Sequence, residues 1–236
     1  MTGKSQHHAM QAILKCMMKQ NLSRNGNSDM SGKCVIFAGA EMNSISDISI
    51  DSDTFIICAD GGYNNAVKFG ITPHIAMGDF DTIGSNTVKG CEIVKYLPEK
   101  DDTDTMIAVK TALEKGFDDI TITGALGGRL DHTFANIQTL MYIAEHNARG
   151  RIIGDSDIVT ILKNSSQIYR KIDGYTFSMF SLTPCSEGIT THGLKYNLEN
   201  GRLLSSFPLG VSNEFVEKSC KIEVKNGVLL IIFSKL

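Results

Sequence analysis

The chain has 236 residues, of which 42% are hydrophobic and 21% charged, and its 23 Lys and Arg against 26 Asp and Glu leave a formal net charge of −3. This composition is typical of a globular protein and excludes a disordered one. The slight acidic excess also argues against a general nucleic-acid binder, although a few local cations or a metal could still hold an anionic substrate.

The first 30 residues are predicted to be an appendage, because a short amphipathic stretch at 10–22 is followed by a polar, linker-like segment at 23–28. From residue 33 onward, short apolar runs end in polar or glycine-rich loops and alternate with helical patterns. The expected strands are 34–38, 55–58, 75–77, 93–97 and 120–122, and the expected helices are 63–69, 105–115 and 130–146. Strands that alternate with helices predict a parallel sheet with crossover helices.

The second half of the sequence shows strand-like runs without a helical pattern. These runs are 152–154, 158–162, 168–172, 175–182, 188–194, 202–207, 220–224 and 228–233. Asp-Gly and Asn-Gly turns separate several of them and are strong hairpin signals. We therefore predict an appendage at 1–30, an α/β domain at 31–153 and an antiparallel β domain at 154–236.

Six cysteines are spread along the chain without a C-x-x-C pair, and three of them lie in or beside apolar runs. Disulfide frameworks are typical of short secreted chains, and zinc sites need closer ligand spacing, so we expect buried free thiols. No run reaches the ~18 apolar residues that a membrane span needs. Lys15 and Lys19 also interrupt the apolar residues of the N-terminus, which therefore lacks a signal-peptide core. The sequence predicts a cytoplasmic protein without membrane partners.

Acidic and glycine-rich segments follow the predicted parallel strands. Because ligands bind at the carboxyl ends of such strands, we expect these segments to converge at one edge of the sheet. They contribute Asp60, Asp79, Asp81, Asp101, Asp102 and Asp104, with Lys100, Arg129, Asp131 and His132 close by.

Carboxylates crowded together repel one another unless a cation neutralises them, and Mg²⁺ is the usual ion where phosphates are handled. Asp79 and Asp81 are two residues apart, so an extended segment places both on the same face. Asp101 and Asp104 are three apart at a predicted helix start. Simple N-capping is the alternative for Asp101 or Asp102. The presence of Asp79 and Asp81 on a neighbouring loop favours metal binding over capping.

Two glycine pairs, Gly61-Gly62 and Gly127-Gly128, precede predicted helices whose N-terminal amides could receive phosphate; a tight strand-to-helix turn is the alternative. The chain has neither a P-loop nor a G-x-G-x-x-G motif. Residues 78–83 are similar to the D-x-D-x-T motif of haloacid-dehalogenase phosphotransferases, but Ile83 stands where that motif needs threonine.

Six segments in order resemble the thiamine pyrophosphokinase family, and the resemblance runs from about residue 35 to the C-terminus. They are CADGG (58–62), GDFDTI (78–83), KDDTD (100–104), GALGGRLDH (124–132), GLKYNLEN (193–200) and GVSNEF (210–215). Each is weak alone, but six in the right order are highly specific. Thr82, Tyr63 and Asn197 depart from the family's common residues at their positions.

The resemblance implies transfer of the pyrophosphoryl group of ATP to the hydroxyl of thiamine, with release of AMP. It implies a Rossmann-like α/β lobe followed by a β-sandwich lobe, and a homodimer whose active sites lie between subunits. It also implies that Asp79, Asp81 and Asp104 hold Mg²⁺ with Asp101 beside them, and that Lys100 and Arg129 offset developing charge. Asp81 or Asp104 is the leading candidate for the base. The substrate-binding residues implied are Asp60, Gly61, Gly62, Arg129, Asp131, His132, Ser212 and Asn213.

Ser212 and Asn213 would contact thiamine according to the resemblance, whereas their residue types alone favour a hairpin turn. Phe215 is a candidate aromatic partner for the thiamine rings. Two other functions remain open: a metal-dependent phosphohydrolase that uses water, and a non-catalytic nucleotide or thiamine sensor. The carboxylate pairs argue against the sensor, and the segments at 193–200 and 210–215 argue against a generic hydrolase.

Overall fold

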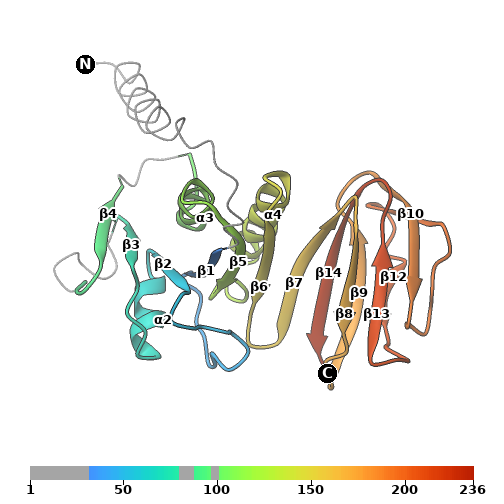
Figure 1. The fold of residues 1–236 in the computed structure, drawn as a ribbon, viewed down its shortest axis with the longest axis horizontal. Helices are drawn as coiled ribbons and strands as arrows, with labels where there is room; N and C mark the ends of the chain where they lie inside the picture. The colour runs from blue at the N-terminus through green and yellow to red at the C-terminus, as the bar shows by residue number, and fades with distance from the viewer. Residues whose placement is uncertain (1–31, 80–87, 97–100) are drawn as a thin grey trace, which may run out of the picture. The chain divides into compact units, whose positions relative to one another are not determined.

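A ten-stranded mixed sheet is the main feature of this computed structural model, which describes residues 32–79, 88–96 and 101–236 (Figure 1). Its first half contains β1 (Gly32–Phe37), β2 (Phe55–Ala59), β3 (Ile75–Gly78), β4 (Glu92–Lys95), β5 (Phe117–Thr123) and β6 (Arg149–Ile153). These six strands are parallel, and the helices between them are α2 (Gly62–Lys68), α3 (Asp104–Glu114) and α4 (Leu130–Glu145). The predicted α/β lobe with crossover helices is confirmed.

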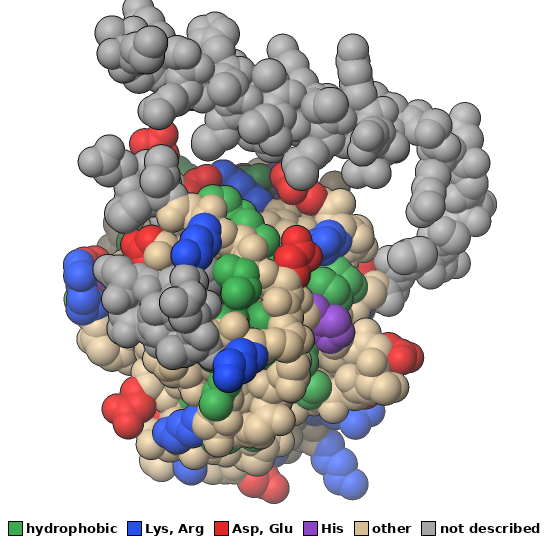
Figure 2. Space-filling view, turned by 90° about the vertical axis from the view of Figure 1, so that its left-hand side faces the viewer, with side chains coloured by type: hydrophobic (Ala, Val, Ile, Leu, Met, Phe, Trp, Pro, Cys, Tyr) green, Lys and Arg blue, Asp and Glu red, His purple; other side chains and the backbone are tan. Residues whose placement is uncertain are grey.

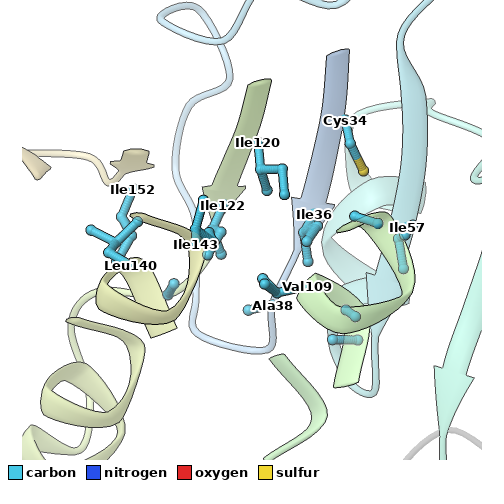
Figure 3. Packing of buried hydrophobic residues seen from close by; sticks show 14 of the residues in the cluster. Cys34, Ile36, Ala38, Ile57, Val109, Ile120, Ile122, Leu140, Ile143 and Ile152 are labelled. Carbon is cyan, nitrogen blue, oxygen red and sulfur yellow. The ribbon is translucent and has the colours of Figure 1, made fainter. Parts of the chain in front are cut away.

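Both faces of the central strand β1 are covered, which explains why its sequence is a continuous apolar run. Cys34 and Ile36 point into a cluster beneath α3 and α4, and Val35 and Phe37 point into a second cluster that includes Ala66 of α2. Figure 3 shows side chains of α3 and α4 packed against those of β1, β5 and β6. The sheet is therefore a rigid layer from which the loops at its carboxyl edge project.

The order of the strands reverses beside β1. The chain proceeds outward from β1 through β2 and β3 to β4, and then returns to place β5 on the other side of β1. Such a reversal is a topological switch point, where open α/β sheets have their ligand crevice outside the carboxyl ends of the strands. The crevice is thus expected above β1 and β5.

The second half of the chain forms a β-sandwich. Its strands are β7 (Asp157–Lys163), β8 (Ser166–Arg170), β9 (Tyr175–Ser181), β10 (Cys185–His192), β11 (Gly201–Leu204), β12 (Gly210–Asn213), β13 (Ser219–Glu223) and β14 (Val228–Lys235). The antiparallel strands β7, β14, β9 and β12 extend the large sheet, and β11, β10, β13 and β8 form a second sheet. Phe177, Ile189 and Ile222 belong to the buried cluster that draws on both sheets. The predicted sandwich is confirmed.

The two lobes share one sheet, which the sequence did not predict. β6 pairs with β7 across the predicted boundary at residue 154, with Ile152 opposite Val159. The complete order is β12-β9-β14-β7-β6-β5-β1-β2-β3-β4. β12 was not among the expected strands; the ends of the other strands and helices differ from the expected ones by no more than three residues.

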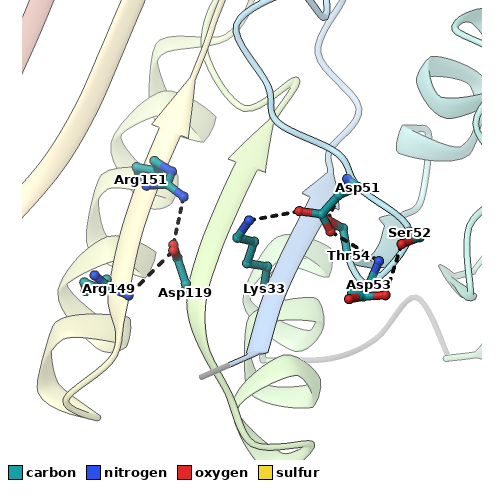
Figure 4. A network of polar contacts seen from close by, with 8 residues as sticks. All are labelled: Lys33, Asp51, Ser52, Asp53, Thr54, Asp119, Arg149 and Arg151. Atoms are coloured by element: carbon teal, nitrogen blue, oxygen red, sulfur yellow. Dashed lines mark hydrogen bonds and ion pairs between the residues drawn. The ribbon is translucent and has the colours of Figure 1, made fainter. Parts of the chain in front are cut away.

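Ion pairs join the charged side chains at the amino edge of the parallel strands (Figure 4). Lys33 lies 2.9 Å from Asp51, and Asp119 lies 2.8 Å from Arg151 and 3.7 Å from Arg149. An open depression of about 920 Å³, lined by residues that include Phe55 and Lys115, also lies at this edge. Ligands of parallel sheets bind at the opposite edge, which is therefore the expected place of the active site.

The face that carries β4, seen in Figure 2, has mixed charge. Among its described side chains, Lys and Arg are interspersed with Asp and Glu, so no patch of one sign forms on the part in view. Within the described ranges, no helix has the length and hydropathy that a membrane span requires.

The five described cysteines are free thiols, and three of them, Cys34, Cys58 and Cys220, are buried. Burial raises the pKa of Cys34 to about 12 and that of Cys220 to about 11. We expect a thiol reagent at pH 8 to label the half-buried Cys91 and Cys185 in the folded protein. The three buried thiols should react only after unfolding, because the reactive species is the thiolate, which burial disfavours. Mass spectrometry of the labelled peptides measures this. Fast native labelling of Cys34 would contradict it.

Candidate active site

The loop after β2 and the end of β3 lie side by side. Asp60 has a φ of 43°, in the left-handed region, and its backbone N–H donates to the Met77 carbonyl at 2.7 Å. A Cβ added to Gly78 would lie 3.0 Å from the Cα of Asp60. The structure therefore brings the half-buried Asp60 next to the half-buried Asp79, as the sequence predicts.

Gly61 and Gly62 form the tight turn from β2 into α2. The backbone of Gly61 faces that of Gly39, and a Cβ on Gly62 would lie 1.9 Å from the Phe37 carbonyl oxygen. Close packing against the end of β1 thus requires glycine at residue 62. The alternative of a tight strand-to-helix turn therefore accounts for Gly62. In addition, α2 has only seven residues, which is too short for a strong dipole at its N-terminus.

The acidic residues of the 101–104 segment have different surroundings at the start of α3. Thr103 is the N-cap, and its hydroxyl accepts a hydrogen bond from the Met106 N–H at 3.2 Å. The alternative in which Asp101 or Asp102 caps the helix is therefore wrong. Asp102 instead forms an ion pair with Lys110 at 2.6 Å, whereas Asp104 is half-buried in the first helical turn, where the helix dipole favours a negative charge.

Tyr96 links the end of β3 to the start of α3. Its backbone N–H donates to the Gly78 carbonyl at 3.1 Å. Burial raises the pKa of the Tyr96 phenol, and the carboxylates of Glu114 and Asp104 raise it further. Tyr96 thus neighbours both Gly78, which precedes Asp79, and Asp104. Asp79 directly follows β3 and Asp104 begins α3, so both predicted metal ligands lie at the carboxyl edge.

The chemistry of these carboxylates suits a hard cation such as Mg²⁺, which prefers oxygen ligands. The described residues alone do not form a group of three His, Cys, Asp or Glu side chains that could hold a metal. Asp81, the third predicted ligand, and Lys100 lie outside the described residues. Asp101 is exposed at the same helix start.

The segment at 124–132 leads from β5 into α4 and carries a charged cluster. Both nitrogens of the Arg129 fork donate to Asp131, Nε at 3.1 Å and Nη2 at 2.5 Å, and Asp131 also accepts from the His132 N–H at 2.9 Å. The hydrogen bond from Arg129 is the main cause that lowers the pKa of Asp131. All three residues are exposed. They sit at the helix start, where the guanidinium and the helix dipole favour an anion.

Ser212 and Asn213 belong to β12, so the hairpin-turn alternative is wrong. Ser212 is exposed, with a φ of 56° at an irregularity in the pairing with β9. Asn213 is 5% exposed, and its side chain accepts from the Tyr196 N–H at 3.1 Å and donates to the Tyr196 carbonyl at 2.8 Å. The amide of Asn213 therefore holds the 193–200 segment against β12.

Tyr196 is an aromatic residue exposed beside β12, and the sequence analysis did not select it. It is 64% exposed, whereas Phe215 packs in the sandwich core with ring centroids 5.5 Å from Phe177 and 6.1 Å from Phe233. The signal that could have identified Tyr196 is its place in the family-like 193–200 segment.

The β-lobe residues are remote from the carboxylates within one chain. β12 and β3 are separated by eight strand spacings in the same sheet. At about 4.8 Å each, this is roughly 35–40 Å along the sheet. The structure therefore places Asp60, Asp79 and Asp104 at one edge of the parallel strands, but it does not bring Ser212 or Asn213 to them.

Two family models match the chain. Residues 47–153 match the catalytic domain of thiamin pyrophosphokinase, and residues 165–229 match its vitamin B1 binding domain. Thiamine pyrophosphokinase of Bacillus subtilis (strain 168) is 32% identical over 209 residues, which cover 84% of this chain and 97% of the relative. Thiamin pyrophosphokinase 1 of Caenorhabditis elegans is 28% identical over 195 residues, covering 73% of this chain and 80% of the relative.

Solved structures agree with these matches. The crystal structure of thiamine pyrophosphokinase from Bacillus subtilis superposes with a TM-score of 0.79 at 29% identity, covering 86% of this chain and 99% of that one. That of thiamin pyrophosphokinase from Geobacillus thermodenitrificans gives a TM-score of 0.77 at 25% identity, with 86% and 97% covered. Sequence and fold together establish that the chain belongs to the thiamine pyrophosphokinase family.

Proposed function

We propose that this chain transfers the pyrophosphoryl group of ATP to the hydroxyl of thiamine, giving thiamine diphosphate and AMP. The observation that carries the proposal is the position of Asp60, Asp79 and Asp104 at the carboxyl edge, in a chain that matches both domains of the family. The thiamine oxygen forms a bond to the β-phosphorus, and the bond from that phosphorus to the bridging oxygen of AMP breaks.

Asp79 and Asp104, together with Asp81, would hold Mg²⁺, which when bound supplies positive charge to the phosphate oxygens. The side chains have separate tasks in this proposal. Asp81 or Asp104 accepts the proton of the thiamine hydroxyl. Arg129 and Lys100 offset the charge that develops on the transferred group, since positioning and electrostatic stabilisation dominate phosphoryl-type transfer. Asp131 keeps the Arg129 fork oriented at the start of α4.

Thiamine would bind at the β domain, 154–236, and ATP at the α/β domain, 31–153. The description of the model matching residues 165–229 supports this division. The Asn213 amide acts by positioning Tyr196 and not by touching thiamine, because its polar atoms are committed to backbone partners. A cytoplasmic location is supported by the free thiols of the five described cysteines.

The proposed enzyme is a homodimer with active sites between subunits. The separation of β12 from β3 supports this, because thiamine held at one chain's β lobe cannot reach the carboxylates of the same chain. Exposed apolar side chains near β12 offer a surface for such contact: Phe207 is 62% exposed, Leu209 58% and Val211 47%.

Asp104→Asn removes a carboxylate of the α/β lobe, and Tyr196→Ala removes the exposed aromatic ring of the β lobe. We expect each variant alone to be impaired and their co-expression to restore activity. If each site combines the α/β lobe of one chain with the β lobe of the other, every mixed dimer contains one intact site. Each mixed dimer isolated through both tags then has about half of the wild-type activity. The measurement is AMP formed per dimer after tandem-tag purification. Activity no higher than that of either variant alone would contradict sites shared between subunits.

The reaction itself is tested by incubating the purified chain with ATP, Mg²⁺ and thiamine and identifying the nucleotide product. AMP that forms only when thiamine is present supports the proposal. ADP would indicate transfer of a single phosphoryl group. AMP or phosphate formed without thiamine would indicate a metal-dependent phosphohydrolase. Each of these results would reject the proposal.

A further inference from the structure

The edge strand β12 contains a β-bulge. Its residues Val211 and Ser212 lie opposite one residue of β9, Ser178, because the pairing of the two strands shifts between Gly210 and Asn213. A bulge interrupts the ladder of backbone hydrogen bonds, bends the strand and can re-aim a side chain. Since bulges also protect the edges of sheets from further pairing, edge protection is the alternative role of this one.

Ser212 has an unusual backbone conformation for its residue type. Five non-glycine residues among those described have a positive φ, and three of them are asparagines in the connections between elements. The fourth is Asp60, and asparagine and aspartate both tolerate the left-handed region. Ser212, with a φ of 56°, is the only one of the five inside a strand. Backbone strain of this kind persists only where the surroundings hold it, and it clusters at binding sites.

The hydroxyl of Ser178 is bonded to the backbone of Ser212. The Ser212 N–H donates to Ser178 Oγ at 3.0 Å, in place of a ladder bond that the bulge interrupts. Ser178 is 9% exposed, and its neighbours on the same face, Phe180 and Ile232, are hydrophobic. A hydroxyl in such surroundings costs free energy unless it is hydrogen-bonded. Within the described ranges, the bond to Ser212 is the one that this hydroxyl makes, so Ser212 accounts for a serine at this position.

Both ends of the bulge are fixed by their contacts. Before the bulge, Gly210 lies so close to the Met179 carbonyl that a Cβ would not fit between them. After it, Asn213 is buried, and its amide is bonded to the backbone of Tyr196. The two bulge residues between these anchors are exposed. The bulge therefore offers solvent a short segment whose conformation is set before any ligand binds, which lowers the entropy cost of binding.

We propose that Ser178 is a positioning residue for thiamine, because its hydroxyl fixes Ser212 in the conformation that presents the Ser212 hydroxyl to the substrate; the inference rests on the proposed function. Ser178 does not touch thiamine itself, since it is buried and Ser212 is exposed. Without the Ser178 hydroxyl, Ser212 is free to relax toward the extended region that serine prefers. Thiamine binding should then weaken, whereas ATP binding, which belongs to the α/β domain, should not change.

Ser178→Ala removes this hydrogen bond without adding bulk. Its matched control is Ser181→Ala on the same strand, because Ser181 is 5% exposed and its Oγ donates to the Thr183 carbonyl at 2.6 Å. We expect Ser178→Ala to weaken thiamine binding about fivefold, or ~1 kcal/mol, the scale of one hydrogen bond. Ser178→Thr keeps a hydroxyl on a side chain that suits a strand and should recover most of the loss. Calorimetry should show wild-type binding of thiamine to the control, and wild-type binding of a non-hydrolysable ATP analogue to all three variants.

A second variant tests whether Ser178 acts through Ser212. Glycine adopts the left-handed conformation without strain, so Ser212→Gly keeps the bulge but removes the hydroxyl that would meet thiamine. Adding Ser178→Ala to Ser212→Gly should therefore weaken thiamine binding no further. The same additional loss in both backgrounds would contradict a role that passes through Ser212.

Equal thiamine binding by Ser178→Ala and Ser181→Ala would overturn the inference and leave the bulge with edge protection alone. An equal loss of thiamine and ATP-analogue binding in Ser178→Ala would also overturn it, because that result indicates a general loss of structure. Calorimetry of thiamine needs neither ATP nor turnover. A wild-type chain that binds thiamine but forms no AMP would reject the proposed function, while the comparison of Ser178→Ala with Ser181→Ala still decides the role of Ser178.

Discussion

Asp104→Asn is expected to lower turnover about 100-fold or more, the scale of losing a main electrostatic contact to the transition state. The amide keeps the shape of the carboxylate but removes the charge that would hold the metal or accept the thiamine proton. The fold should survive, because Thr103 caps α3 and the lost charge at the helix start is worth only about 0.3–1 kcal/mol. The measurement is the rate of AMP formation at saturating ATP and thiamine.

Asp102→Asn is the matched control, two residues earlier on the same segment. Its carboxylate pairs with Lys110 at the surface, with 40% and 36% of the two side chains exposed, and such pairs contribute about 0–1 kcal/mol to stability. We expect turnover within about twofold of wild type, because the Asp102 charge is already matched by Lys110. Near-normal turnover in Asp104→Asn would remove Asp104 from the metal and base roles. An equal loss in both variants would indicate a general effect of charge at the start of α3.

The strands and helices were predictable because their signals are local. The apolar run from Cys34 to Phe37 is continuous since helices cover both faces of β1. The helical spacing in α4 likewise marks the face that packs on the sheet, where Leu140 and Ile143 are fully buried. The carboxyl-edge site followed from topology, because parallel strands bring the loops after β2 and β3 to the same edge.

The features that sequence analysis missed depend on partners distant in the chain. Asp155 holds Asn43 across 112 positions, and Asn213 holds Tyr196 across 17. A hydrogen bond between such residues leaves no periodic pattern in the sequence. The shared sheet was missed for a different reason: β6 and β7 are neighbours in the chain, but the turn between them is equally compatible with a boundary between separate sheets.

The N-cap of α3 shows a different limit. Asp101, Asp102 and Thr103 are all residue types that cap helices well, so composition alone does not choose among them. The structure selects Thr103, and this choice leaves Asp104 inside the first turn and Asp102 free to pair with Lys110. The residue at which α3 begins therefore decides the different surroundings of Asp102 and Asp104.

Gly62→Ala is expected to lower the free energy of unfolding by about 3 kcal/mol, at the upper end of overpacking in a core. The added Cβ would lie 1.9 Å from the carbonyl oxygen and 2.5 Å from the carbonyl carbon of Phe37. Phe37 is fully buried in the middle of the sheet, so neither side can move without displacing β1. For a chain of this size the melting temperature should fall by about 6–12 °C, which a thermal melt followed by circular dichroism measures.

Gly61→Ala is the matched control for this effect, because it makes the same chemical change one residue earlier in the same turn. Its Cβ would have Gly39 Cα as nearest neighbour at 3.5 Å, an ordinary contact, and its φ of −53° is open to alanine. We expect its free energy of unfolding to stay within about 0.5 kcal/mol of wild type. Equal destabilisation of the two variants would mean that the turn needs the flexibility of both glycines. A loss confined to Gly62→Ala would identify the close approach of α2 to β1 as the constraint, because only the second glycine faces the Phe37 carbonyl.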